Sequence, residues 1–428
     1  MVAPPVTVKG APGNPIRIRA LHEGRVLIDG EGKLRPVYLS KNEFISIEGI
    51  NACCSKYDVF YLSATKGVSI RRVVGWNAAP DQNAMIFSIA YGTDTLLEDT
   101  AGFGSARKTY QYFQTDGPAT IRRAWGEWNW SLNKGPKMTF SLVYNSRNLT
   151  VENAIGTWRS LMPSRYVLMN NGKPFVAGVW SEYNHKVTTC GVGALQPDGT
   201  CLVTDGKIDQ MYGVLTADAF SRGQPDRRAN SRYLGSIAYV PPGMDTSLLP
   251  RLVFVTQVEG ISLENVMTWW PVSPSDKEAV LLGNCTARAP EVPCNSSNPG
   301  LVVRNLTAFG GRIRIAGLTA TQWRTTGLVE AVSPMALYGK SGASIFAPGD
   351  KGGASLCYQY RDGVLTRTPL WPWPMNDRIK EAMVQAGREP VDVTKTIESL
   401  FGPIPAACRS DAAPSPVPSA SASSRNGS

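Results

Sequence analysis

Basic residues recur just before a strand-like run in successive segments of this chain, and their types suit the binding of an acidic polymer. They are Arg35, Lys56, Arg107, Lys108, Lys137 and Arg251. No acidic residue alternates with them, so stacked copies would form a stripe of like charge that an extended anion would neutralise. Nearby aromatic side chains are suited to stacking on sugar rings. These aromatic residues are Tyr57, Tyr110, Tyr112 and Trp128. The alternative is a solvated strip that Asp58, Glu127 and Asp209 partly neutralise.

Composition favours an anionic partner. The 428 residues include 44 Lys and Arg against 34 Asp and Glu, which gives a net charge of +10. A surface that is merely basic would have the same composition. The chain is 43% hydrophobic, as expected of a globular protein, and contains no apolar run near the ~20 residues that span a bilayer. Its two histidines argue against a histidine-rich metal site.

A repeated phrase fixes the spacing of the basic residues. Each copy has an aliphatic residue, a charged residue, and usually Gly, Asn or Asp, which tolerate a left-handed backbone. The copies begin at Ile47, Ile70, Leu97, Ile121, Val151, Leu263 and Val303. The first five lie 23, 27, 24 and 30 residues apart, and a small residue always follows five positions after the aliphatic one. Such a period predicts a solenoid whose repeats are single turns of chain.

Each repeat contains a second strand-like run upstream of the phrase. These runs cover residues 37–39, 60–62, 86–88, 110–112, 140–142 and 254–256. Turn residues separate the two runs, and a third short strand follows the Asn or Gly. The charged position alternates in sign through Glu48, Arg71, Glu98, Arg122 and Glu152. Because equivalent positions in stacked strands lie ~4.8 Å apart, we expect a ladder of ion pairs there rather than a catalytic site.

The order strand, turn, strand, bend, strand and loop resembles the right-handed parallel β-helix superfamily over residues 10 to 335. Residues 10–20 and 26–30 look like the first repeat of secreted proteins of this fold, many of which are polysaccharide lyases. The resemblance implies that Asn153, Asn265 and Asn305 stack in the bends. Arg72 and Arg123 occupy the same position, so we expect those two bends to differ in geometry. The predicted fold class is an all-β solenoid with a small, partly helical C-terminal cap.

The same resemblance suggests β-elimination on uronate units. Lyases of this fold bind their polymer along the first strand, and a basic residue removes the C5 proton while cations neutralise the carboxylate. By resemblance, Lys108 and Lys137 are the base or carboxylate-neutralising candidates, with Arg107 and Arg165 in support. Many such lyases use Ca²⁺, for which Asp99, Glu127 and Asp209 offer oxygen ligands. The polymer would also contact Arg35, Lys56, Tyr110, Tyr112, Trp128 and Arg251.

Two other functions are compatible with these features. The first is a non-catalytic surface, adhesive or structural β-helix protein. The second is a glycoside hydrolase, which needs two carboxylates about the bond. Polygalacturonases of this fold have a Gly-His-Gly motif and paired Asp, and both are missing here. Arg312-Ile313-Arg314 matches two of the three residues of their Arg-Ile-Lys motif. The prediction is therefore a monomeric protein that binds an acidic polysaccharide, not nucleic acid, with cleavage left open.

The rest of the chain divides into excursions, a cap and a tail. Residues 1–338 are expected to form the β-helix, with long excursions over about 159–230 and 271–300. Residues 339–408 are expected to cap the last repeat, with helices over 376–385, where Asn376 is the N-cap, and 393–401. Residues 409–428 are rich in Ala, Pro and Ser and are predicted to be disordered.

Cysteine spacing favours an oxidising compartment. Three pairs are predicted to form disulfide staples, which are bonds that close loops: Cys190 with Cys201, Cys285 with Cys294, and Cys357 with Cys408. Adjacent Cys53 and Cys54 are not expected to bridge to each other. The sequence opens without the positive and apolar regions of an export signal, so a secreted location implies a mature or truncated form.

Overall fold

The structure is a computed structural model, and it describes most of the first 159 residues and parts of the remainder. The described residues are 1–80, 82–131, 133, 137–143, 146–159, 166–170, 173–175, 194–195, 201–203, 211–218, 228–242, 244, 251–256, 259–270, 278–283, 300–315, 323–331, 345–346 and 356–410. This part of the chain is mostly β, with two large parallel sheets and two short C-terminal helices, so the all-β class is confirmed.

The larger sheet contains the strands of the repeated phrase and those that follow its bend. Its strands are β1 (Ile16–Arg19), β2 (Leu27–Asp29), β4 (Ile45–Glu48), β5 (Asn51–Cys53), β7 (Ser69–Trp76), β9 (Thr95–Phe103), β11 (Asp116–Arg122), β12 (Trp125–Trp128), β14 (Arg147–Glu152), β15 (Ile155–Trp158), β21 (Arg228–Leu234), β22 (Ile237–Tyr239), β24 (Glu259–Trp269), β26 (Leu301–Phe309) and β28 (Trp323–Ala331).

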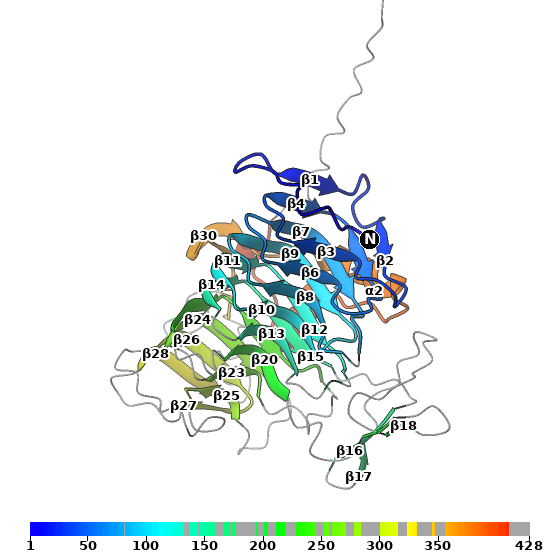
Figure 1. The fold of residues 1–428 in the computed structure, drawn as a ribbon. Coiled ribbons are helices and arrows are strands. Elements are labelled where there is room, and N and C mark those ends of the chain that lie inside the picture. Colours follow the sequence, from blue (N-terminus) through cyan, green and yellow to red (C-terminus); the bar gives the residue numbers. More distant parts are fainter. Residues whose placement is uncertain are drawn as a thin grey trace, which may run out of the picture.

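The second sheet contains the upstream runs, as predicted. Its strands are β3 (Val37–Ser40), β6 (Phe60–Ser63), β8 (Met85–Ala90), β10 (Lys108–Phe113), β13 (Lys137–Val143), β20 (Met211–Asp218), β23 (Val253–Thr256), β25 (Glu278–Leu282) and β27 (Arg312–Ile315). Each strand pairs in parallel with its equivalent in the neighbouring repeat, as in Val37 with Phe60 and Phe60 with Phe87. Figure 1 shows both sheets descending through the molecule as successive strands of the repeats.

The remaining described strands are small additions. Residues from the first long excursion form a sheet of β16 (Tyr166–Asn170), β17 (Lys173–Phe175), β18 (Ala194–Leu195) and β19 (Cys201–Val203). A hairpin of β29 (Tyr358–Arg361) and β30 (Val364–Pro369) precedes helices α2 (Asn376–Gln385) and α3 (Val393–Phe401). Most of the second excursion and the tail from residue 411 lie outside the described residues.

The core lies between the sheets and explains the small residue in each repeat. The aliphatic residues of the phrase, such as Ile47, Ile70 and Leu97, are fully buried. The ring of Phe87 stacks on those of Phe60 and Tyr110 at centroid distances of 4.8 and 4.7 Å. The third strand approaches these rings closely. A Cβ at Gly126 would lie 2.7 Å from Cγ2 of Thr139, and one at Gly156 would lie 2.4 Å from Cγ1 of Val214, so a larger residue would overpack the core.

The charged positions form the predicted ladder. Glu48, Arg71, Glu98, Arg122 and Glu152 are in register across β4, β7, β9, β11 and β14. The Arg122 guanidinium lies 3.2 Å from a Glu98 oxygen and 2.8 Å from a Glu152 oxygen. Because Arg122 and Glu152 are buried, their pairing matters more than that of exposed charges. The ladder therefore aligns neighbouring repeats.

The bends share one left-handed geometry. Asn153, Asn265 and Asn305 have φ of 48°, 53° and 53°, and the amide of Asn305 donates to the Asn265 side-chain oxygen over 3.1 Å. Arg72 and Arg123 have φ of 52° and 49°, so the prediction of a different geometry for them was wrong. Their guanidinium groups pair with the carboxylates of Glu23 and Asp99, contacts that help hold the two arginines in this conformation.

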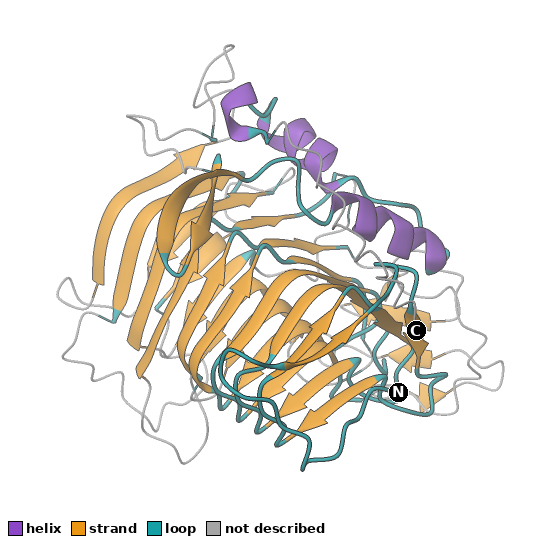
Figure 2. Cartoon of the chain, turned by 90° about the horizontal axis from the view of Figure 1, so that it is seen from above, coloured by secondary structure: helices purple, strands orange, loops and turns teal. Residues whose placement is uncertain are grey.

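Residues 356–410, which we call the strap, lie along the side of the larger sheet rather than over its last strand. Figure 2 shows the helices running across the strands. Both predicted helices are present, although Met375 rather than Asn376 is the N-cap of α2. The strap contacts repeats far apart in sequence. Arg378 donates to Asn51 over 2.6 Å, and the Tyr360 amide donates to Asn153 over 2.6 Å.

The predicted cap over the last repeat is therefore not seen in the described part of the strap, which lies along the side of the larger sheet. The strands that follow the bends have an apolar outer face, and the strap packs against this face and buries it. This face includes Val74, Trp76, Phe103, Trp125, Ile155 and Phe309. Trp371, Trp373, Ile379 and Phe401 pack into the same cluster. Burial of this apolar area is the main reason for the lateral position of the strap.

Two disulfides lie in the described residues. Cys357 and Cys408 are bonded, with sulfurs 2.18 Å apart, which confirms one predicted staple. Cys53 and Cys54 are also bonded, at 2.06 Å, so the expectation that they would not bridge was wrong. Cys54 adopts a left-handed φ of 63° at the end of β5, a local turn that the spacing of cysteines does not reveal. Cys190, Cys285 and Cys294 lie outside the described residues, and of Cys201 only the backbone in β19 is described, so the other two predicted pairs stay predictions.

Within the described residues, neither α2 nor α3 combines the length and the apolar character needed to cross a membrane.

Candidate functional site

The predicted basic stripe is not open to solvent in its middle. Lys108 and Lys137 are 1% and 3% exposed, and Arg107 is buried as well. The Lys108 ammonium donates to the Gln111 side-chain oxygen over 2.7 Å, and the Arg107 guanidinium donates to Asn83. An exposed stripe through these positions is therefore contradicted, because the outer face of β8, β10 and β13 is itself buried. Arg165 lies outside the described residues.

Three of the predicted sugar-stacking residues face the interior. Tyr110 and Tyr112 are fully buried, because the alternation of β10 directs both rings into the core. Burial raises the pKa of each hydroxyl far above its ordinary value. Trp128 stacks on Trp158 with centroids 6.1 Å apart, and its indole donates to the Ala106 carbonyl. The prediction that these rings contact a polymer was wrong.

The described carboxylates of the predicted calcium site do not fit that ion. Glu127 lies 2.7 Å from Arg388 and 3.5 Å from Arg159. Burial opposes its ionisation, but the two guanidinium groups outweigh burial and lower the pKa of Glu127. Asp99 accepts hydrogen bonds of 2.7 and 2.8 Å from Arg123. Both carboxylates already neutralise arginines, so calcium would have to displace these partners. Asp209 lies outside the described residues.

One other group of potential metal ligands occurs in the described part of the chain. Oxygen and sulfur atoms of Asp29, Cys53 and Cys54 lie within 4.8 Å of one another. The two sulfurs form the disulfide and so do not offer the thiolates that bind metals. The group is thus not a metal site in this state of the protein.

Two predicted cations, Arg35 and Lys56, come together with three tyrosines on an open face. The guanidinium carbon of Arg35 lies 4.7 Å from the ring centroid of Tyr57 and 4.6 Å from that of Tyr61. It lies 5.7 Å from the ring of Tyr38, and the Lys56 ammonium lies 5.8 Å from that of Tyr57. We call these five residues the tyrosine–arginine surface. Arg251, by contrast, pairs with Glu278 over 3.2 Å and stacks on Phe254.

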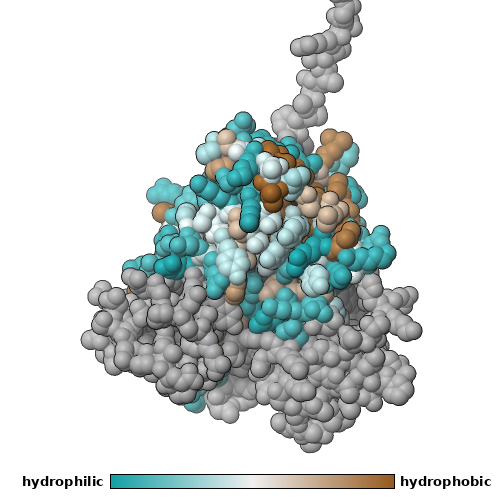
Figure 3. Space-filling view, viewed as in Figure 1, coloured by the Kyte–Doolittle hydropathy of each residue, from teal (hydrophilic) through white to brown (hydrophobic). Residues whose placement is uncertain are grey.

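Strand register and a tight turn position this surface. Tyr38 and Tyr61 are paired in β3 and β6, and their outward rings stack with centroids 5.6 Å apart. Between β5 and β6, the Ser55 hydroxyl accepts from the Tyr57 amide and donates to the Asp58 carbonyl. The turn leaves Lys56 and Tyr57 exposed. In Figure 3, described atoms over these first repeats form an open surface of mostly hydrophilic to intermediate character.

Asp58 lies beneath the tyrosine–arginine surface. Its side chain is buried, with one oxygen 3.5 Å from Arg35 and the other accepting from the Met85 amide over 3.0 Å. Burial raises the pKa of Asp58 to about 6, although Arg35 and the Met85 amide both favour the charged form. The carboxylate is therefore poised to change its charge near neutral pH.

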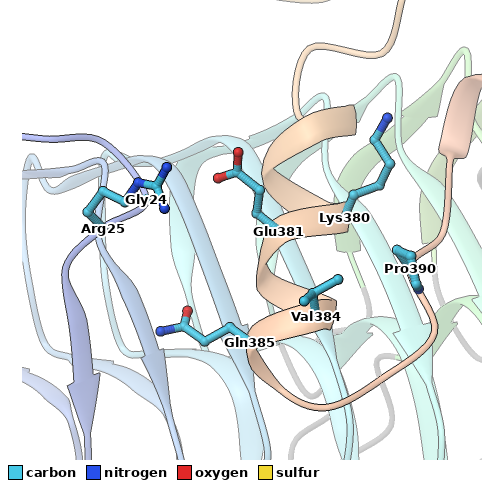
Figure 4. Close-up of a pocket in the computed structure, with 7 residues that line it drawn as sticks. All are labelled: Gly24, Arg25, Lys380, Glu381, Val384, Gln385 and Pro390. Carbon is cyan, nitrogen blue, oxygen red and sulfur yellow. The ribbon is translucent and has the colours of Figure 1, made fainter.

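A pocket of about 550 Å³ lies elsewhere, between α2 and the turn after β1. Its lining residues are Gly24, Arg25, Lys380, Glu381, Val384, Gln385 and Pro390. Figure 4 shows the side chains of Glu381 and Gln385 extending from the helix toward the turn that carries Arg25. Lys380 already pairs with Asp377 and Asp392. This lining lacks the aromatic rings and unpaired cluster of cations that an acidic sugar polymer would use, so the pocket is the weaker candidate.

Comparison with models of protein families, with curated proteins and with solved structures finds no match to this chain.

Sequence reasoning included Arg35, Lys56 and Tyr57 but missed Tyr38 and Tyr61. Their signal was present in the alternation of Val37-Tyr38-Leu39-Ser40 and Phe60-Tyr61-Leu62-Ser63, which places both tyrosines on the face opposite the core. The same alternation explains why Tyr110 is internal, since it aligns with Phe87 rather than with Ser88.

Proposed function

We propose that this protein binds an acidic polysaccharide on the outer surface of a right-handed parallel β-helix. The parallel, repeat-by-repeat pairing of both sheets supports the solenoid, and the ladder of charges supports stacked repeats. In this proposal the helix is a rigid scaffold, and the tyrosine–arginine surface is the binding site.

The observation that carries the proposal is the placement of two cations among three outward tyrosines. Arg35 is 32% exposed, and Lys56 and Tyr57 are exposed. Guanidinium and ammonium groups neutralise the carboxylates of a polyuronate, and the aromatic rings offer flat surfaces to sugars. The net charge of +10 attracts such a polymer from a distance.

We favour binding without cleavage over a lyase. A base for β-elimination must reach the C5 proton of the sugar, and Lys108 and Lys137 are buried. The tyrosine–arginine surface has one carboxylate beneath it, Asp58, which Arg35 partly neutralises. That arrangement also does not resemble the pair of carboxylates that hydrolysis uses. An extracellular location is part of the proposal, and the Cys357–Cys408 and Cys53–Cys54 disulfides support it.

We expect Arg35→Ala combined with Lys56→Ala to weaken binding to pectate roughly tenfold, because two charge-assisted contacts are lost. Titration calorimetry of the full chain with pectate, alginate and a glycosaminoglycan measures the effect and ranks the polymers. The matched control is Arg361→Ala combined with Arg367→Ala, which removes the same charge from the exposed hairpin of β29 and β30.

Equal losses in the two double variants would show nonspecific attraction and contradict the assigned surface. Absence of binding by the unaltered protein would contradict the function itself. Ultraviolet absorbance is recorded in the same mixtures. New absorbance from unsaturated sugar ends would replace the proposed binding function with that of a lyase.

A further inference from the structure

Arg35 faces two kinds of environment at once. Its side chain is partly exposed at the tyrosine–arginine surface, and one of its nitrogens lies 3.5 Å from the buried carboxylate of Asp58. The rings of Tyr57 and Tyr61 lie within 4.7 Å of the guanidinium carbon and restrict where it can move. A polymer carboxylate that binds Arg35 must therefore share this cation with Asp58.

Asp58 is held in a fixed position from two sides. The Met85 amide donates to its Oδ1 atom over 3.0 Å, while Oδ2 faces Arg35. Among the described residues, the charged and titratable groups of the elements packed around it are Arg35 and Tyr38 at β3, Lys56 and Tyr57 in its own turn, Tyr61 in β6, Arg107 just before β10, and Lys108, the first residue of β10 and the register partner of Met85. The Lys108 ammonium is bonded to Gln111. Arg107 is bonded to Asn83, and Arg35 is the charged residue that stabilises the Asp58 carboxylate.

We propose that Asp58 is an internal competitor of the polysaccharide for Arg35, and that the tyrosine–arginine surface therefore binds acidic polymer more tightly when Asp58 is protonated. This inference rests on the proposed function and adds its regulation by pH. Ionised Asp58 pairs with Arg35 and repels a polymer carboxylate. Protonated Asp58 does neither, and it leaves the guanidinium free to pair with the incoming anion.

The direction of the pH effect follows from the charges. Burial raises the pKa of Asp58 to about 6, so its carboxylate is ionised at neutral pH and becomes protonated as the pH falls below that value. Uronate carboxylates have ordinary pKa values near ~4 and stay charged over this range. By linkage, the polymer should in turn raise the pKa of Asp58 further when it binds.

The test compares pectate binding by the full chain at about pH 5 and about pH 7.5, in the same salt, by titration calorimetry. We expect the unaltered protein to bind roughly threefold to tenfold more tightly at the lower pH. Asp58→Asn should bind with that higher affinity at both pH values. Asp94→Asn is the matched control, because it removes an equal charge from an exposed turn, and it should keep the pH dependence of the unaltered protein.

Each outcome separates the inference from the function on which it rests. Binding that is equally tight at both pH values would overturn the role of Asp58 and leave the binding function standing. A pH dependence that persists in Asp58→Asn would also overturn it, since a group other than Asp58 would then be responsible. If Asp58→Asn does not fold, the pH profile of binding by the unaltered protein is compared with that of Arg35→Ala instead. Arg35→Ala should bind weakly and with a smaller pH dependence, because the competition for the guanidinium is gone and only the repulsion by ionised Asp58 remains.

Discussion

Replacing Arg388 with methionine should lower the free energy of unfolding by about 3–5 kcal/mol, because it leaves a buried charge without its main partner. The side chains of Arg388 and Glu127 are 4% and 1% exposed. Their ion pair of 2.7 Å joins the strap to β12, and Arg388 also donates to Asn129 over 2.8 Å.

Denaturant unfolding of the full chain measures this change. Arg367→Met, an exposed replacement in β30, should cost less than about 0.5 kcal/mol. The effect should also depend on pH with a definite sign. Arg388 and Arg159 lower the pKa of Glu127 despite its burial, so the stability they add is present above the ordinary Glu pKa and is lost as the pH falls through the lowered value. An equal loss in both variants would mean that the strap is not anchored here.

Removing the disulfide of the strap should have the next largest effect. Cys357 and Cys408 lie 51 residues apart, and a crosslink that closes a loop of this length contributes about 2–4 kcal/mol. We expect Cys357→Ser combined with Cys408→Ser to lose that amount in denaturant unfolding. Protease should also cut the strap of this variant sooner than that of the unaltered protein.

Ser399→Ala provides the control for the disulfide variant, since Ser399 is an exposed residue of α3 outside the crosslink itself. It should unfold close to the unaltered protein. If the cysteine variant also keeps its full stability and protease resistance, the apolar cluster under the strap and its ion pairs would suffice to hold it, and the disulfide would be redundant.

The repeat was predictable from sequence because it depends on local features. The aliphatic, charged and bend positions of the phrase each face one fixed environment. The spacing of Glu98 and Arg122 therefore predicted their contact, and the bounds of both C-terminal helices were predicted correctly, although the N-cap of α2 is Met375 and not Asn376. The left-handed bends at Arg72 and Arg123 were not foreseen. The phrase alone does not show that ion pairs with Glu23 and Asp99 hold these arginines in place.

The candidate site was harder to predict because burial depends on contacts between distant segments. Lys108 begins β10 and Arg35 stands just before β3, yet Lys108 is 1% exposed and Arg35 remains partly open. Likewise, the lateral strap depends on an apolar outer face that single repeats reveal only as isolated aromatic residues. Glu127, considered as a calcium ligand, pairs with Arg388, which lies 261 residues further along the chain.

The most direct test of the central claim is a lysine footprint of the full chain with and without bound pectate. A lysine-acylating reagent is applied, and mass spectrometry measures the modified fraction of each lysine. We predict that pectate protects Lys56, within the tyrosine–arginine surface, and leaves the modification of the exposed Lys33 and Lys395 unchanged. Uniform protection of all three, or protection of Lys33 and Lys395 but not of Lys56, would contradict the account.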